Sequence, residues 1–393
     1  MNTHTNTHTR THTFKPILIL QLLIRACVTV AGLEAFEAEV AEHLGKDSAM
    51  FFQTGVAAQN AALAVHSALP FLAYRTEPPP CFVVHATSHL IRYEEDAYSK
   101  LLGVNALLAG DEERVMCARD IEVHLARLAA VGCAPSMILV ELPHRELGCE
   151  TPSWDELVQM RKLADQYGVP MHLDGARLWE IAPYYAETAG VSISEIVRLF
   201  DSAYVSFYKG LGALTGAMLL GDRKFIGEAG VWRRRLGANP YTSMPYALSC
   251  RDAFRRHADT FGARWQKMRR LVPLLAAAAE AEGATFRTIP AEPQSCQAHA
   301  CIAAGGATEA AMDAARDAVE AECGVRLYGR LLGRPPEPPA ARDGGSGGDE
   351  EAAAEEHYFE WHIGPGHVEL DDALFVEAWA SFFRELARRG VST

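Results

Sequence analysis

Short runs of apolar residues alternate with longer amphipathic segments through the first two thirds of the chain. Each run is four or five residues long, which is typical of a strand buried on both faces. The runs predict seven strands, at 49–53, 81–85, 104–108, 137–141, 170–174, 203–207 and 217–220. An alternation of this kind predicts an α/β domain around a mostly parallel sheet.

The helical pattern ahead of the first strand marks where this domain begins. Apolar residues recur at helical spacing from Leu33 to Leu44, and Gly45 supplies a stop directly after them. We therefore expect a large α/β domain over residues 33–245.

The last part of the chain predicts a smaller unit that follows a long helix. Basic residues interleave with Leu and Ala over 246–282, which predicts a connecting helix with one solvated face. A small C-terminal α+β domain is expected over 283–393, with strands near Phe286, Cys301 and Tyr358 and helices over 309–322 and 373–387. Within it, the Pro, Gly and acidic residues of 333–356 predict a flexible loop.

The first 32 residues differ in composition from the rest of the chain. They contain no Asp or Glu and many Thr, and their apolar run at 17–24 is shorter than the roughly 20 residues that span a bilayer. We predict a disordered or targeting-like N-terminal segment. The expected location is cytoplasmic, or an organelle if this segment is a transit peptide.

Composition then limits the classes of function. The 393 residues are 49% hydrophobic and carry a formal net charge of −13, which opposes electrostatic binding of nucleic acid. Nine cysteines without a C-x-x-C pair favour reduced thiols. We expect a soluble protein that acts on a small molecule, with no nucleic acid, membrane or metal partner.

Two of the predicted strands deliver an acid and an amine to one edge of the sheet. Asp174 ends the strand at 170–174, and Lys209 follows the strand at 203–207. A lysine beside glycines can form an imine with an aldehyde, and a protonated pyridine nitrogen would hold a buried aspartate ionised. The pair predicts a pyridoxal 5'-phosphate (PLP) site, with Lys209 as the Schiff-base amine and Asp174 as the counter-ion. An ordinary Asp–Lys pair is the alternative for either residue alone.

The segments His172–Arg177 and Ser206–Ala213 resemble signature segments of the threonine aldolase and aromatic amino acid β-eliminating lyase family, and the resemblance covers roughly Leu33 to Tyr246. It implies an α/β fold of the fold type I, PLP-dependent transferase kind. It also implies an amino acid substrate and a homodimer or homotetramer with active sites between subunits.

The resemblance assigns roles to further residues. Gly55, Val56 and Ala57 match the turn that holds the cofactor phosphate, where a helix begins and its free N–H groups point at an anion. Ser206 has a hydroxyl for the same phosphate.

Three more residues are candidates on the substrate side. His89 matches the histidine that stacks on the pyridine ring, and its imidazole is suited to relay a proton. Arg177 matches the arginine that binds the substrate carboxylate. His144, after the strand at 137–141, is a second candidate for proton transfer at the substrate.

The implied reaction is retro-aldol cleavage of a β-hydroxy-α-amino acid, for instance of threonine to glycine and acetaldehyde. β-Elimination or another reaction at Cα is the first alternative, and a silent homologue that pairs with an active subunit is the second. The chain departs from the family at Val56, at 237–242 and at Glu360, where the family has a threonine, a glycine-rich segment with an arginine, and a second carboxylate-binding arginine. These departures leave the preferred amino acid open.

Overall fold

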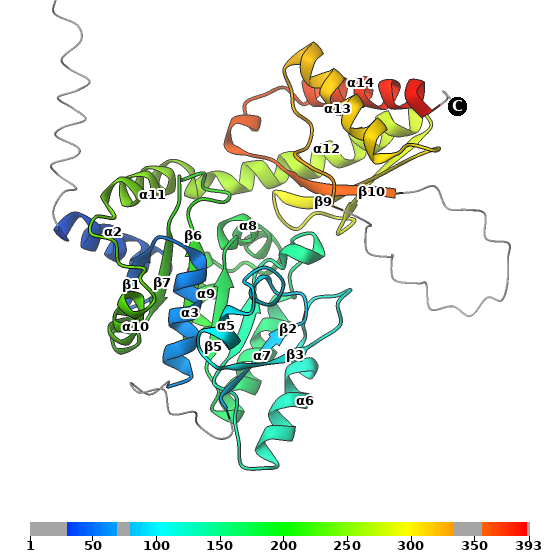
Figure 1. Cartoon of the computed structure of the whole chain (residues 1–393). Coiled ribbons are helices and arrows are strands. Elements are labelled where there is room, and N and C mark those ends of the chain that lie inside the picture. The colour runs from blue at the N-terminus through cyan, green and yellow to red at the C-terminus, as the bar shows by residue number, and fades with distance from the viewer. Residues whose placement is uncertain (1–29, 69–78, 333–355, 391–393) are drawn as a thin grey trace, which may run out of the picture.

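The computed structural model describes residues 30–68, 79–332 and 356–390 (Figure 1). Nearly all of the predicted N-terminal segment and of the predicted loop at 333–356 lies outside these described residues. No helix of the described part is long and apolar enough to cross a membrane.

A seven-stranded sheet forms the centre of the larger unit. Its strands are β1 (Ser48–Phe52), β2 (Cys81–His85), β3 (Asn105–Ala109), β4 (Ile138–Glu141), β5 (Met171–Gly175), β6 (Ser202–Ser206) and β7 (Ala217–Gly221). They lie in the order β1-β7-β6-β5-β4-β2-β3. The two pairings of β7, with β1 and with β6, are antiparallel and the other four are parallel, so the sheet is mostly parallel, as the apolar runs predicted.

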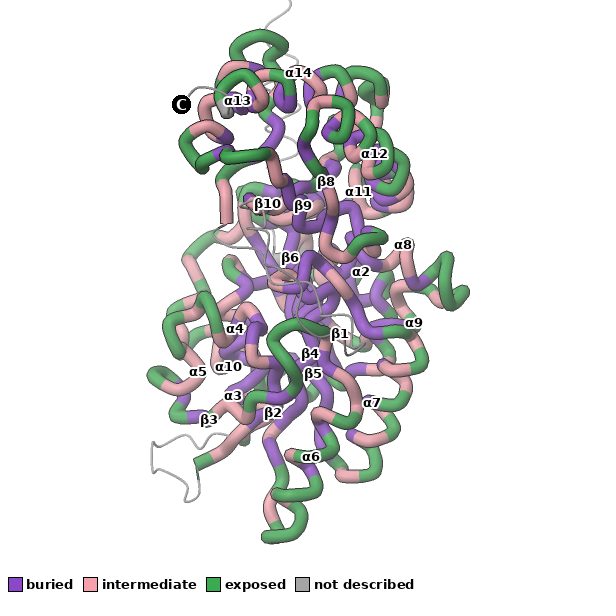
Figure 2. Tube along the Cα trace, turned by 90° about the vertical axis from the view of Figure 1, so that its right-hand side faces the viewer, coloured by how far each residue is buried: buried purple, intermediate pink, exposed green. Residues whose placement is uncertain are grey.

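Helices cover both faces of this sheet because alternate strand residues point to opposite sides. On β6, Ala203 and Val205 join the largest core cluster, whereas Tyr204 joins a second cluster on the other face. Figure 2 shows the buried strands inside a shell of partly exposed helices. The helices are α2 (Val30–His43), α3 (Gly55–His66), α4 (His89–Arg92), α5 (Ala97–Lys100), α6 (Ala118–Ala129), α7 (Trp154–Tyr167), α8 (Leu178–Ala189), α9 (Ile193–Arg198) and α10 (Arg223–Arg235).

The predicted helix over 246–282 is divided into α11 (Met244–His257) and α12 (Phe261–Ala281) by a short 3-10 turn at Ala258–Thr260. In this turn the Thr260 hydroxyl donates to the His257 carbonyl at 2.8 Å. A threonine hydroxyl bonded to the preceding turn competes with the helical backbone pattern, which accounts for the break.

A second, antiparallel sheet follows α12 in the chain, and its strands lie in the order β10-β9-β8 (Figure 1). Its strands are β8 (Ala284–Ile289), β9 (Gln297–Ala304) and β10 (Glu356–His362), and it is accompanied by α13 (Glu309–Cys323) and α14 (Asp372–Gly390). These elements match the strands and helices predicted for the C-terminal part of the chain.

The topology gathers the candidate residues at one edge of the large sheet. β2, β4, β5 and β6 are mutually parallel, so their carboxyl ends lie at the same edge. Ligands of open parallel sheets bind outside such an edge. The segments that follow these strands carry His89, His144, Arg177 and Lys209.

Candidate active site

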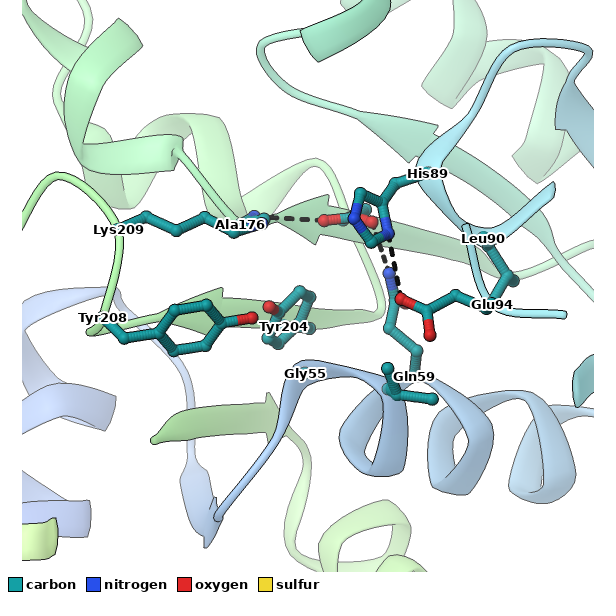
Figure 3. Close-up of a pocket in the computed structure, with 11 residues that line it drawn as sticks. Gly55, Gln59, His89, Leu90, Glu94, Ala176, Tyr204, Tyr208 and Lys209 are labelled. Carbon is teal, nitrogen blue, oxygen red and sulfur yellow. Dashed lines mark hydrogen bonds and ion pairs between the residues drawn. The ribbon is translucent and has the colours of Figure 1, made fainter. Parts of the chain in front are cut away.

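A pocket lies at this edge, between the ends of β5 and β6 and the beginnings of α3 and α4 (Figure 3). Its walls include five of the residues predicted from the sequence, and these are Gly55, Val56, His89, Asp174 and Lys209. The structure therefore brings the amine, the acid and the helix start together in one cavity.

Asp174 is the acid of this pocket and is almost completely buried, at 2% exposure. One carboxylate oxygen accepts a hydrogen bond from the Gln59 amide, and the other accepts from the backbone N–H of Ala176 at 3.1 Å. Burial, followed by the charge of Glu141, raises the pKa of Asp174 to about 6, while Lys209 opposes the rise. Glu141 acts here because it pairs in register with Asp174 on the adjacent strand. The site thus places two acids side by side, a setting that favours a bound cation.

Lys209 supplies the amine, and its side chain extends into the pocket towards His89 (Figure 3). Burial and then the nearby charge of Arg177 lower the pKa of Lys209, while Asp174 and Glu141 partly restore it. A lowered pKa makes the neutral, nucleophilic amine more available for attack on a carbonyl.

His89 is held in place from two sides. Its Nδ1 lies 3.0 Å from a carboxylate oxygen of Glu94, which also lines the pocket (Figure 3). Its backbone N–H donates to Glu141 at 3.0 Å. A carboxylate on one ring nitrogen fixes the tautomer and orientation of an imidazole, which suits the other nitrogen to accept a proton.

Two residues predicted to bind the cofactor phosphate, Ala57 and Ser206, do not line this pocket. The N–H of Ala57 donates to the Thr54 side chain at 3.3 Å, and Ala57 does not line the pocket. Ser206 is buried on β6 but does not line the pocket either, and its Oγ has no hydrogen-bond partner within the described residues. Their phosphate-binding roles stay predictions.

Arg177 lines a neighbouring pocket, and Lys209 lines both cavities. The Arg177 Nε donates to the Gln297 side chain at 3.0 Å, and Glu180, Arg264 and Glu360 line the same pocket. An arginine can bind a carboxylate with two hydrogen bonds, and the role of Arg177 at the substrate carboxylate stays a prediction.

His144 lines neither of these two pockets. Its Nε2 is 2.8 Å from the Thr87 hydroxyl, and its ring centre is 4.5 Å from that of His85. The proposed role of His144 at the substrate therefore stays a prediction, and in this structure the residue is part of a buried polar cluster.

Sequence reasoning missed several pocket residues, among them Gln59, Glu94, Tyr204 and Tyr208. Gln59 carries a usable signal, because it lies one helical turn after Gly55 on an otherwise small and apolar face of α3. Glu141 does not line the pocket, but it ends β4 and pairs in register with Asp174, so its place at the end of an apolar run is another signal.

Gly55 is constrained by its contact with Tyr204. A Cβ at Gly55 would lie 2.0 Å from the Tyr204 hydroxyl oxygen, and Tyr204 is buried with little room to move. We expect Gly55→Ala to lower the free energy of unfolding by about 1–3 kcal/mol, as overpacking does. Urea denaturation measures this change.

Gly227→Ala is the matched control for that substitution. Gly227 lies inside α10 and its Cβ would meet nothing within 4 Å, so alanine should stabilise the protein by up to about 1 kcal/mol. A Gly55→Ala protein as stable as the wild type would contradict the close contact with Tyr204.

Two curated proteins are similar to about half of this chain. The aldolase vrtJ of Penicillium aethiopicum is 30% identical over 211 residues, 53% of this chain and 50% of that protein. The alanine racemase TOXG of Cochliobolus carbonum is 33% identical over 220 residues, 56% of this chain and 53% of that protein. The chain thus spans about half the length of these curated relatives.

The similarity to solved structures extends over nearly the whole chain. The crystal structure of a proposed L-allo-threonine aldolase from Listeria monocytogenes EGD-E has a TM-score of 0.74 and 27% identity, and the match covers 97% of this chain and 95% of that one. This confirms the predicted fold type I architecture. The profile of the beta-eliminating lyase family matches residues 31–318. The chain therefore belongs to the beta-eliminating lyase family of PLP-dependent enzymes, the family that its two motifs predicted.

Proposed function

We propose that this protein is a PLP-dependent lyase that cleaves the Cα–Cβ bond of β-hydroxy-α-amino acids, with threonine giving glycine and acetaldehyde. The observation that carries the proposal is that the Lys209 amine and the Asp174 carboxylate line one pocket together with His89. The family membership and the likeness to a proposed L-allo-threonine aldolase support it.

The residues of the pocket fit this cofactor. Lys209 would hold its aldehyde carbon, Asp174 would pair with its ring nitrogen, and the first turn of α3 at Gly55 and Val56 would receive its phosphate. Because glycine has no side chain, the backbone of Gly55 itself faces the cavity. When bound, PLP supplies a ring that accepts the electron pair released at Cα.

The protein's own residues would divide the remaining work. Arg177 lines the second pocket together with Lys209 and would bind the substrate carboxylate. This contact would hold the Cα–Cβ bond of the substrate in one orientation. His89, oriented by Glu94, would remove the proton from the substrate hydroxyl as the Cα–Cβ bond breaks. Lys209, with its lowered pKa, would return a proton to Cα once the aldehyde has left.

Product analysis tests the proposal. We expect the PLP-loaded protein to convert L-threonine or L-allo-threonine to equal amounts of glycine and acetaldehyde, measured by amino acid chromatography and an alcohol dehydrogenase assay. Ammonia and a keto acid in their place would indicate β-elimination. No turnover by a PLP-loaded homo-oligomer would favour a silent homologue.

A second candidate is a different reaction at Cα of an amino acid. Similarity to the alanine racemase TOXG at 33% identity favours it, because racemisation needs the same amine and the same electron-accepting ring. L-Alanine incubated with the loaded protein would then yield D-alanine on chiral chromatography, and threonine would remain intact.

A further inference from the structure

A continuous line of hydrogen bonds leads away from the pocket behind Asp174. The Gln59 amide donates to Asp174, and the Gln59 oxygen lies 3.0 Å from Nε2 of His172. The Nδ1 of His172 lies 2.7 Å from the Ser202 hydroxyl, which lies 2.7 Å from Nε2 of His66. His172 and Ser202 are completely buried, whereas His66 is partly exposed. The line therefore joins the pocket to the protein surface.

The secondary structure explains why these residues meet. His172 and Asp174 are two residues apart on β5 and point to the same face of the sheet, and His172 pairs in register with Ser202 on β6. Gln59 and His66 are seven residues apart on α3, which is two helical turns. One face of one helix thus lies over one face of two strands.

The direction of each hydrogen bond follows from the chemistry at the two ends. An ionised carboxylate only accepts, so the Gln59 NH2 faces Asp174 and its oxygen faces His172. Complete burial keeps the pKa of His172 far below its usual range, so the ring is neutral and has one N–H, which must be at Nε2.

The remaining bonds are then determined. With the proton at Nε2, the Nδ1 of His172 accepts, and the Ser202 hydroxyl donates to it. The Ser202 oxygen in turn accepts from Nε2–H of His66. Every donor in the line therefore points towards Asp174, and bonds aligned in this way polarise and strengthen one another.

We propose that His66, Ser202, His172 and Gln59 form a one-way donor chain that orients the Asp174 carboxylate and keeps it ionised for the nitrogen of the cofactor ring. These four are positioning residues, because they act through Asp174. The cofactor role rests on the proposed function, whereas the direction of the chain is a property of the protein alone.

The first experiment measures that direction without cofactor. Protein labelled with ¹⁵N-histidine is prepared free of PLP, and the imidazole nitrogens are assigned by the loss of signals in His172→Phe and His66→Gln. We expect His172 as the neutral tautomer protonated at Nε2, with little change between pH 6 and 8. A tautomer protonated at Nδ1, or an imidazolium, would overturn the donor chain.

The second experiment measures the effect on the cofactor. In metal sites, loss of an outer hydrogen-bond partner of a ligating side chain typically costs about 10–100-fold in affinity, and we take this as the scale for the partners of Asp174. We expect His172→Phe to raise the Kd for PLP about tenfold and Ser202→Ala, which removes a single oxygen, to raise it by a smaller factor. Both should shift the pH midpoint of the absorbance band of bound PLP. His172→Gln, whose amide can still donate to Gln59, should recover part of the affinity.

Thr288→Val is the matched control, because it removes a buried hydroxyl from β8 of the small sheet. It should leave both the Kd and the absorbance midpoint unchanged. Wild-type values of both in Ser202→Ala and His172→Phe would overturn the cofactor role. A wild-type protein that binds no PLP would instead overturn the proposed function, and the tautomer of His172 would still decide the direction of the chain.

Discussion

Lys209→Ala is expected to abolish covalent attachment of PLP and to lower kcat for threonine cleavage by about 10³-fold or more. Of the described residues that line the two pockets, Lys209 is the only lysine. No other amine is therefore in position to bond the cofactor aldehyde or to return a proton to Cα.

Absorbance spectroscopy and mass spectrometry check this result. The wild type incubated with PLP should absorb above about 400 nm, and borohydride should remove the band and fix the cofactor mass on the peptide that contains Lys209. Lys224→Ala, on the exposed side of α10, is the control and should behave as the wild type. A Lys209→Ala protein that retains the band would rule out this lysine as the attachment point.

Asp174→Asn is expected to leave PLP attached to Lys209 but to lower kcat by about 10²–10³-fold, the usual effect of removing one polar group that stabilises developing charge. Asparagine keeps the shape of the side chain and loses the charge that pairs with the ring nitrogen. Steady-state kinetics with threonine measures the loss. Asp259→Asn, at an exposed site, is the control, and equal kcat for Asp174→Asn and wild type would contradict the counter-ion role.

Asp174→Asn should also change how the stability of the cofactor-free protein depends on pH. The pKa of Asp174 is about 6 in the folded chain and about 3.9 in an unfolded one, so the folded state binds more protons between these values. Its contribution to stability therefore declines as the pH rises from about 4 to 6. Asp174→Asn should remove this decline in urea unfolding measured across that range. An unchanged slope in the variant would assign the decline to other groups.

Much of the fold could be predicted because the spacing of apolar residues along the chain indicates which residues are buried. The run Met137–Glu141 indicates a strand buried on both faces, and it is one. The meeting of Asp174 and Lys209 was also predictable, since parallel strands bring their carboxyl ends to one edge. Neither inference needs knowledge of how any helix is rotated.

The residues that were missed depend on such rotation. Gln59 reaches Asp174 only because α3 presents that face to β5, and Glu94 reaches His89 only through the turn that follows α4. Ser206 follows Tyr204 by two residues on β6 and so shares its face of the sheet, yet only Tyr204 lines the cavity, and the phosphate-binding role of Ser206 stays a prediction. Side-chain direction on helices and strand ends is set by packing between distant segments, which a local pattern does not encode.

Glu141 lies opposite Asp174 in the register of β4 and β5, and this pairing affects the stability of the protein before it binds its cofactor. The two neighbouring acids repel each other in the empty protein, and a ligand that binds only the folded state adds to its stability. Cells short of vitamin B6 should therefore accumulate less of this protein, at equal rates of synthesis, than cells with an ample supply.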